Sequence, residues 1–236
     1  MDLIKTHWSK KDLDELKIYL NTLKSSNYDC EWEQRIVNTK LECFGRTSTK
    51  ARELVKIIKK GNYIDFLDNI HITNHLESII CAFLISNIKD FEVFEKKLDN
   101  YVTTIDNWAS CDTLRFKNKD KNKLFLLSKK YLKNSLPFVR RVGIDIFFEL
   151  IKSEEYLQHA FNLFDSLKNE TEYYVNMCAA WLLSYCYIYY PDKTIVYFEN
   201  HKTNSFIINK GISKCRESYR ISKENKQLLL KYKMTK

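Results

Sequence analysis

The sequence contains very little glycine and proline, with 4 Gly and 2 Pro among 236 residues. Sheets joined by tight turns require more of both residues, so this scarcity favours helices. The two prolines, Pro137 and Pro191, leave long stretches in which a helix would run without interruption. Hydrophobic residues make up 44% and aromatic residues 14% of the chain. That composition supplies enough apolar surface for a core and excludes a disordered chain.

Long apolar runs are also missing. The longest, residues 179–190, spans about 12 residues and includes Ser184, whereas a membrane helix needs roughly 20. The first residues, Met1 to Lys5, have neither the basic region nor the apolar run of a signal peptide. We therefore expect a soluble, cytoplasmic protein.

Common metal-site and nucleotide-binding motifs are absent from the sequence. It contains no G-x-G-x-x-G, no P-loop and no H-E-x-x-H motif, and none of its 7 cysteines forms a C-x-x-C pair. We interpret the cysteines as reduced and mostly buried thiols. His71 and His75 lie four residues apart, but no third ligand is evident nearby, so surface histidines are favoured over a metal site.

The charge of the chain is concentrated in two basic segments. Residues 115–141 contain ten Lys and Arg against one acid, and residues 201–236 contain ten against two. The two segments carry net charges of +9 and +8, so the rest of the chain carries −8. This distribution indicates a surface that binds a polyanion, and the alternative is ordinary solvated helix faces.

Apolar residues recur at helical spacing along nearly the whole chain. Thr47 or Ser48 is the expected N-cap of the second helix, and Gly61 its C-terminal stop. The segment 174–189 is apolar on nearly all sides, so it should be central. The expected helices span residues 13–23, 51–58, 62–70, 76–84, 91–102, 108–116, 124–132, 138–151, 156–167, 174–189, 192–200, 205–219 and 223–233.

The number of expected helices gives roughly one pair every 35 to 40 residues, the period of helical-repeat solenoids. No linker rich in Gly, Ser or Pro interrupts them, so we expect a single all-α domain over residues 1–236. The pairs show weak similarity to one another, and a helical bundle of another kind is the alternative.

Five positions stand out as candidates for chemistry. Trp108 and Asp112 are four residues apart and therefore share one face of a helix. Arg141, Trp181 and Lys214 follow at separations of 29, 40 and 33 residues, about one helix pair each. A carboxylate can offset developing positive charge, indole faces can hold a cation or a sugar, and a guanidinium can anchor phosphate.

The segments that contain these residues carry a resemblance. The motifs D-N-W-A-S-C-D (106–112), V-R-R-V-G-I (139–144) and Y-Y-V-N-M-C-A-A-W (173–181), with the tail 209–220, resemble the AlkD-like DNA alkylation repair proteins. The order and spacing agree over residues 44–219. The resemblance implies a superhelical solenoid of HEAT-like antiparallel helix pairs with a concave basic cleft. It also implies a DNA glycosylase that releases N3-methyladenine and N7-methylguanine from duplex DNA.

The resemblance also implies roles for individual residues. Trp108 and Asp112 match the family's active-site residues, Arg141 its phosphate-binding arginine and Trp181 its second cleft tryptophan. Asp112 would stabilise an oxocarbenium-like sugar and orient water, while both indoles pack on the deoxyribose. Arg140 and Lys214 are the further residues expected to contact DNA. Such an enzyme needs no metal or organic cofactor, and we expect a monomer.

The sequence departs from the family motifs at two places, and simpler interpretations exist for two of the candidate residues. Leu182-Leu183-Ser184-Tyr185 follows Trp181 where the family has x-Leu-Arg-Glu, and Thr49 replaces a proline of the family's loop 44–49. From composition alone, Trp181 would be a core residue and Asp112 the ion-pair partner of Arg115 or Lys117. The alternative functions are a non-catalytic DNA-binding module and a protein-binding helical scaffold.

Overall fold

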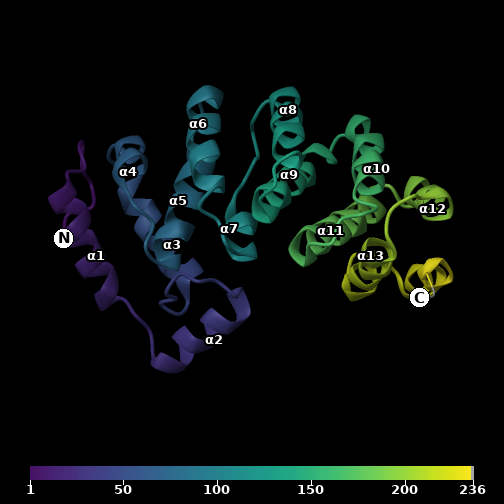
Figure 1. Ribbon diagram of the computed structural model, residues 1–236, viewed down its shortest axis with the longest axis horizontal. Coiled ribbons are helices and arrows are strands. Elements are labelled where there is room, and N and C mark those ends of the chain that lie inside the picture. Colours follow the sequence, from purple (N-terminus) through teal and green to yellow (C-terminus); the bar gives the residue numbers. More distant parts are fainter. Residues whose placement is uncertain (235–236) are drawn as a thin grey trace. The chain divides into compact units, whose positions relative to one another are not determined.

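The computed structural model describes residues 1–234, which form 14 α-helices and two short 3-10 helices and no β-strand (Figure 1). This confirms the all-α class. The chain divides into two compact units, one of residues 1–119 and one that begins at Asp120. The single domain and the concave cleft expected from the sequence stay predictions.

The first unit is built around α5. Helices α3, α5 and α7 form a row in which each contacts the next, and α4 and α6 pack on α5 (Figure 1). Leu76, Ile80 and Leu84 of α5 are wholly buried, because α3, α4, α6 and α7 all pack on this helix. The helices of this unit are α1 (Lys10–Thr22), α2 (Asn27–Val37), α3 (Thr47–Ile58), α4 (Tyr63–Asn69), α5 (His75–Asn87), α6 (Phe91–Val102) and α7 (Trp108–Thr113).

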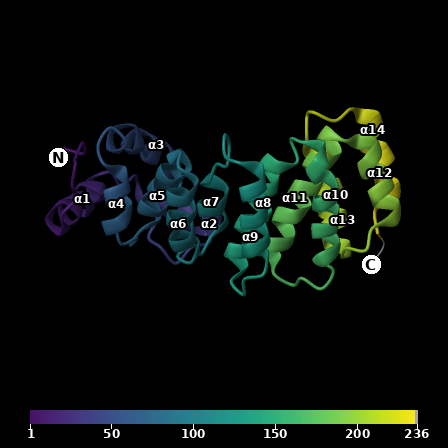
Figure 2. The ribbon, with the colours of Figure 1, turned by 90° about the horizontal axis from the view of Figure 1, so that it is seen from above.

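The second unit repeats this arrangement around α11. Helices α9, α11 and α13 form a row, α8 packs on α9 and α12 packs on α11 (Figures 1 and 2). The central position expected for residues 174–189 is confirmed. The elements of this unit are α8 (Lys121–Leu132), α9 (Pro137–Leu150), η1 (Glu154–Tyr156), α10 (Leu157–Ser166), α11 (Tyr173–Tyr189), α12 (Pro191–Asn200), α13 (Ser205–Glu217), α14 (Lys223–Leu228) and η2 (Leu229–Tyr232).

Glycine allows the close contact between α11 and α13. A Cβ at Gly211 would lie 2.9 Å from Leu183 Cδ2 and 3.3 Å from the carbonyl oxygen of Ala180. The absence of a side chain at Gly211 therefore allows α11 and α13 to pack this closely.

Most helices begin at a polar N-cap residue whose side chain accepts a hydrogen bond from a backbone amide of the first turn, which satisfies a donor that the helix cannot pair. Helices α9 and α12 instead begin at Pro137 and Pro191, whose missing amide is not needed there. The N-cap residues with such a bond are Ser9, Ser26, Asn62, Asn74, Asp90, Asn107, Asp120, Asn204 and Ser222.

The N-cap expected at Thr47 or Ser48 is wrong. Arg46 occupies that position in a left-handed conformation (φ 53°) and forms no side-chain cap. The carboxylate of Glu33, on α2, replaces it by accepting hydrogen bonds from the amides of Gly45 and Thr47 and from the Thr47 hydroxyl, at 3.0, 3.1 and 2.6 Å. A residue distant in sequence therefore satisfies the start of α3, and no local pattern can reveal it.

Other expectations for single elements are mixed. Helix α2 was not expected at all, and the helix expected over 108–116 ends at Thr113. His75 is 2% exposed, so the expectation of a surface histidine is wrong there, and burial holds its pKa below the ordinary value. All seven cysteines are free thiols, six of them buried, as expected. None of the helices within residues 1–234 is both long and apolar enough to cross a membrane.

Candidate functional site

Helix α7 of the first unit carries Trp108 and Asp112 on one face. Trp108 is the first residue of this short helix and Asp112 is one turn further on, and both side chains are half-buried. The helix begins there because the side chain of Asn107 accepts a hydrogen bond from the Ser110 amide at 2.9 Å. The start of α7 therefore fixes the direction in which both candidate residues point.

Asp106 ties this start to the preceding part of the unit. Its carboxylate accepts hydrogen bonds from Thr39 Oγ1 at 2.6 Å, from the Lys40 amide at 2.7 Å and from Asn107 Nδ2 at 2.9 Å. Burial alone would raise the pKa of Asp106, but the hydrogen bonds of Thr39, Asn107 and Lys40 outweigh it and lower the pKa. The ionised carboxylate is thus the form that holds α7 in place.

The serine of the same motif anchors α7 to the core of the unit. Ser110 is wholly buried, and its hydroxyl lies 2.9 Å from the hydroxyl of Ser78 on α5. The hydroxyl of Tyr101 on α6 donates to the Ser78 carbonyl oxygen at 3.0 Å. In the motif D-N-W-A-S-C-D, Asp106, Asn107 and Ser110 therefore have structural roles, whereas the candidate residues Trp108 and Asp112 are half-buried.

The indole of Trp108 contacts α2. Its Nε1 donates a hydrogen bond to the carbonyl oxygen of Ile36 at 3.2 Å. Asp112 has a different neighbour, because Arg115 Nη1 donates to the main-chain carbonyl oxygen of Asp112. This contact involves the main chain of Asp112, whereas the pairing considered from the sequence concerned its carboxylate.

Lys50 also fixes the loop 44–47. Its amine donates hydrogen bonds to Ser25 Oγ and to the carbonyl oxygens of Phe44 and Gly45, at 2.8, 2.9 and 2.7 Å. Burial lowers the pKa of Lys50. Gly45 has a φ of 69°, and a Cβ there would lie 2.8 Å from the Cβ of Ser25. Sequence reasoning missed Glu33 and Lys50, because both act through contacts distant in sequence.

The two arginines on α9 of the second unit are both held in place. Arg140 Nε and Nη2 donate to the two carboxylate oxygens of Glu170 at 3.0 and 3.2 Å, and its Nη1 donates to the carbonyl oxygens of Asn134 and Ser135. Arg141 is 5% exposed, and its Nη1 donates to the Tyr174 carbonyl oxygen at 2.6 Å. Arg141 thus reaches towards α11, whereas Arg140 closes the loop before that helix.

Trp181 and Lys214 lie on the next two helices of the same row. Trp181 on α11 is half-buried and packs against Phe148 with ring centroids 4.6 Å apart. Lys214 on α13 forms an ion pair with Glu217 at 2.8 Å, and its side chain is 35% exposed. The sequence-predicted residues therefore fall into two groups, Trp108 with Asp112 in the first unit and the remaining four on α9, α11 and α13 of the second.

Comparison with known families identifies the chain. A family model described as "DNA alkylation repair enzyme" matches residues 9–214, most of the 236 residues. The chain belongs to this DNA alkylation repair family. No curated protein and no solved structure matches it. Family membership supports a role in DNA repair and implies DNA as the partner.

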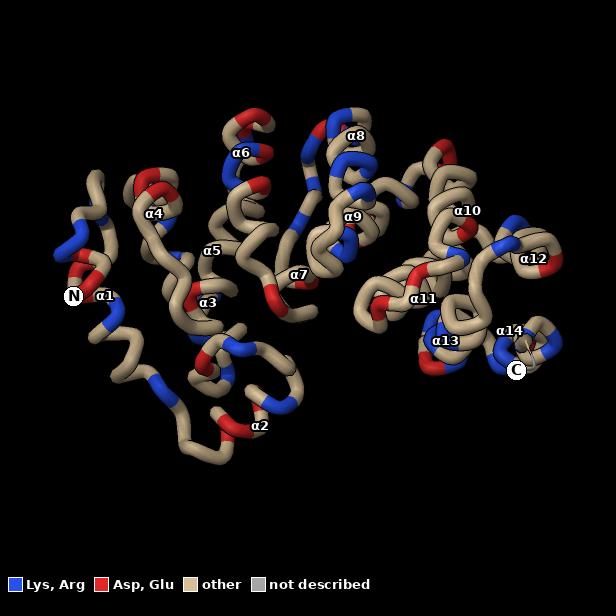
Figure 3. Tube along the Cα trace, in the orientation of Figure 1, with Lys and Arg blue, Asp and Glu red and all other residues tan. Residues whose placement is uncertain are grey.

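For a member of this family, the distribution of basic residues matters. Helix α8 contains four lysines and no acid, but it belongs to the layer outside the row α9–α11–α13 (Figure 3). A second group of Lys and Arg lies on α13, α14 and η2 and on the segments between them (Figure 3). The basic block 115–141 is therefore divided between layers, whereas the basic block near the C-terminus adjoins the row that contains Trp181.

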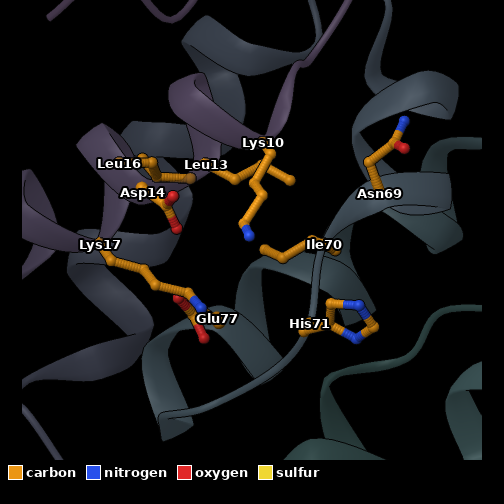
Figure 4. A pocket seen from close by; sticks show the side chains of 9 residues that line it. All are labelled: Lys10, Leu13, Asp14, Leu16, Lys17, Asn69, Ile70, His71 and Glu77. Atoms are coloured by element: carbon orange, nitrogen blue, oxygen red, sulfur yellow. The ribbon is translucent and has the colours of Figure 1, made fainter.

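A cavity of about 450 Å³ lies between α1 and the segment that joins α4 to α5. Lys10 points into its middle, with Lys17 and Glu77 on one side and His71 on the other (Figure 4). Two lysines are balanced by Asp14 and Glu77, so the lining has no strong preference for an anion. None of the sequence-predicted residues lines it, and within residues 1–234 no cluster of His, Cys, Asp and Glu could hold a metal ion.

Proposed function

We propose that the protein is a DNA glycosylase that excises positively charged N-alkylated purines, such as N3-methyladenine and N7-methylguanine, from duplex DNA. The observation that carries the proposal is the pair Trp108 and Asp112, held on one face of α7 in a member of the DNA alkylation repair family. That the protein acts as a cytoplasmic monomer is part of the same proposal.

The chemistry requires one carboxylate and little else from the protein. Alkylation gives the base a positive charge, so it leaves with the electron pair of the C1′–N bond without a strong general acid. The sugar then carries oxocarbenium-like positive charge, which the Asp112 carboxylate stabilises. Asp112 also orients the water that adds to C1′ and accepts its proton. The indoles of Trp108 and Trp181 pack on the deoxyribose.

The remaining site residues bind the DNA backbone. Arg141 is the proposed phosphate ligand; it is 5% exposed, and its Nη1 already donates to the Tyr174 carbonyl oxygen. Arg140, paired with Glu170, contributes less charge to a flanking phosphate than a free guanidinium would. Lys214 is 35% exposed and can exchange Glu217 for a phosphate at low cost, because exposed ion pairs are weak.

The test is the release of methylated bases from treated duplex DNA by the wild-type protein and by Asp112→Asn. We expect release by the wild type and none by the variant, with the same helical signal and melting temperature. Asp14→Asn is the matched control, because Asp14 is an exposed aspartate of the same unit. Release by Asp112→Asn at the wild-type rate would remove Asp112 from the catalytic role.

A non-catalytic DNA-binding protein is the second candidate function. It is favoured by the departure at Ser184 and Tyr185, which stand where the family has Arg and Glu. DNA binding that weakens steeply with salt, without base release by the wild type, would support this reading, because phosphate contacts release counterions. Weak binding that does not respond to salt would contradict both candidates.

A further inference from the structure

An aromatic strip crosses the row of helices in the second unit. Along α11 the rings of Trp181, Tyr185 and Tyr189 follow one another at four-residue spacing, with centroids 5.9 and 6.1 Å apart. Phe148 on α9 extends the strip, since its ring lies 4.6 Å from Trp181 and 5.1 Å from Tyr185. The four rings form one continuous surface made by two neighbouring helices.

This strip lies on the side of α11 that the core does not use. The buried residues of α11 include Leu182, Leu183 and Cys186, whereas Trp181 and Tyr185 are half-buried and Tyr189 is 36% exposed. A helix that packs on one face normally presents polar residues on the other. Here the partly exposed face carries three aromatic rings, and Tyr185 stands at the position where the family has glutamate.

Arg220 covers the far end of the strip. Its guanidinium carbon lies 5.7 Å from the centroid of Tyr185 and 5.2 Å from that of Tyr189, within the range of a cation–π contact. Within residues 1–234 this guanidinium makes no hydrogen bond or ion pair, so its donors are available to a ligand. Residues 201–236, to which Arg220 belongs, carry a net charge of +8.

We propose that the aromatic strip binds unpaired DNA nucleotides along Tyr185 and Tyr189, beyond Trp181, which packs on the deoxyribose at the lesion, with Arg220 on the adjacent phosphates. The proposal rests on the proposed function for its ligand, DNA, and it narrows the substrate to duplexes with an unpaired stretch beside the bound region. Aromatic faces combined with basic side chains are the general means by which proteins hold single strands.

Two observations favour unpaired bases over paired ones. The bases of an intact duplex are stacked on one another, so their faces are not available to an aromatic ring. The ring planes of Trp181 and Tyr185 stand at 85° to one another and those of Tyr185 and Tyr189 at 60°, so the strip cannot match the parallel faces of a continuous base stack and suits a strand whose bases are separated. The net charge of +8 in the adjoining segment favours a polyanion over an apolar protein segment as the occupant.

The experiment compares two labelled DNA probes without any lesion by fluorescence anisotropy. One is a fully paired duplex, and the other is a duplex of the same length with a short gap of single-stranded thymidines. We expect the wild type to bind the gapped probe more tightly, and Tyr189→Leu to reduce this preference about five-fold or more. Tyr189→Phe keeps the ring and should keep the preference. Arg220→Gln should reduce it.

A matched control is Tyr173→Leu. Tyr173 is 55% exposed on the same helix, but its ring contacts Tyr174 and Phe206 and not the strip. This variant should bind both probes like the wild type. Thermal melting followed by circular dichroism identifies any variant that fails to fold, and Tyr189→Phe provides a ring-retaining comparison for that case.

Three results would overturn the proposal: equal affinity of the wild type for the two probes, equal losses on both probes in Tyr189→Leu, or no DNA binding at all. The outcome is independent of catalysis, because the probes contain no alkylated base. A wild type that prefers the gapped probe and releases no methylated base would contradict the proposed glycosylase alone. Base release without a preference for the gapped probe would contradict this inference alone.

Discussion

Asp106→Asn tests how the candidate site is held. The Asp106 carboxylate accepts three hydrogen bonds that connect Thr39, Lys40 and Asn107, and Asn107 caps the helix that bears Trp108 and Asp112. An asparagine keeps one acceptor oxygen and turns an NH₂ group towards the remaining donors. We therefore expect the first unit to be less stable and base release to fall, although Asp106 itself does not contact substrate.

The size of the effect follows from the lost hydrogen bonds. A hydrogen bond to a charged group contributes ~1.5–3 kcal/mol, and a half-buried carboxylate belongs at the lower end of that range. With part of the network retained, Asp106→Asn should cost about 2 kcal/mol. Because the folded pKa of Asp106 is lowered, its contribution is present at neutral pH and is lost as the pH falls below about 4.

Urea unfolding followed by tryptophan fluorescence measures this cost. Trp8, Trp32 and Trp108 lie in the first unit, so the signal reports mainly on the unit that contains Asp106. A loss of about 2 kcal/mol should move the midpoint by about 1 M urea, and Asp14→Asn should not move it. Midpoints that agree between wild type and Asp106→Asn at pH 7, or a difference that persists unchanged at pH 3, would refute the reasoning.

Three further predictions concern other parts of the structure. Glu33→Ala should cost about 2–3 kcal/mol in urea unfolding, because the amides of Gly45 and Thr47 lose their acceptor, and a loss below about 0.5 kcal/mol would contradict this role. Under native conditions a thiol reagent should label Cys30 fastest, since the other six are buried; rapid labelling of all seven would be incompatible with the fold. Arg141→Ala should weaken DNA binding and reduce the slope of log affinity against log salt by about 1; unchanged affinity would remove Arg141 from the interface.

The helices were predictable wherever they bury an apolar stripe. The segments that became α3 and α6 repeat apolar residues at helical spacing, and those residues are the buried ones. The segment that became α11 is apolar on nearly all sides, which predicted its central position. In helix α2 the apolar residues Tyr28, Trp32 and Ile36 recur at four-residue spacing, but all three are exposed and Val37 is the only buried residue. The helix is held by polar contacts, among them those of Glu33, so its apolar spacing does not mark a buried face.

Details that depend on distant partners could not be predicted. The start of α3 is satisfied by Glu33 from another helix, so the local preference for Thr47 or Ser48 had no weight. His75 is the first residue of α5 and is buried, whereas His71 lies in the segment that precedes this helix. The sequence spacing of His71 and His75 implied a shared helical face, but only His75 belongs to the helix.

The residues of the candidate site could be predicted from the sequence, but their burial and their contact partners could not. The four-residue spacing placed Trp108 and Asp112 on one helix face, which the structure has. The choice between Arg140 and Arg141 rested on the family motif, and no pattern in the sequence indicates that Glu170 would engage Arg140 or that Arg141 would be 5% exposed. For Trp181, composition favoured the core, whereas its ring is half-buried beside Phe148.

The motif around α7 combines residues that hold the helix in place with residues proposed to contact the substrate. Asp106, Asn107 and Ser110 are occupied by contacts that any stable copy of this helix needs, whereas Trp108 and Asp112 occupy its half-buried face. A family resemblance can therefore persist through the structural residues alone.

Comparing Asp106→Asn with Asp112→Asn separates the two roles. The first should reduce stability and release together, and the second should reduce release alone. If both variants changed stability and neither changed release, the motif would be preserved for folding, and DNA binding without catalysis would be the better account of this protein.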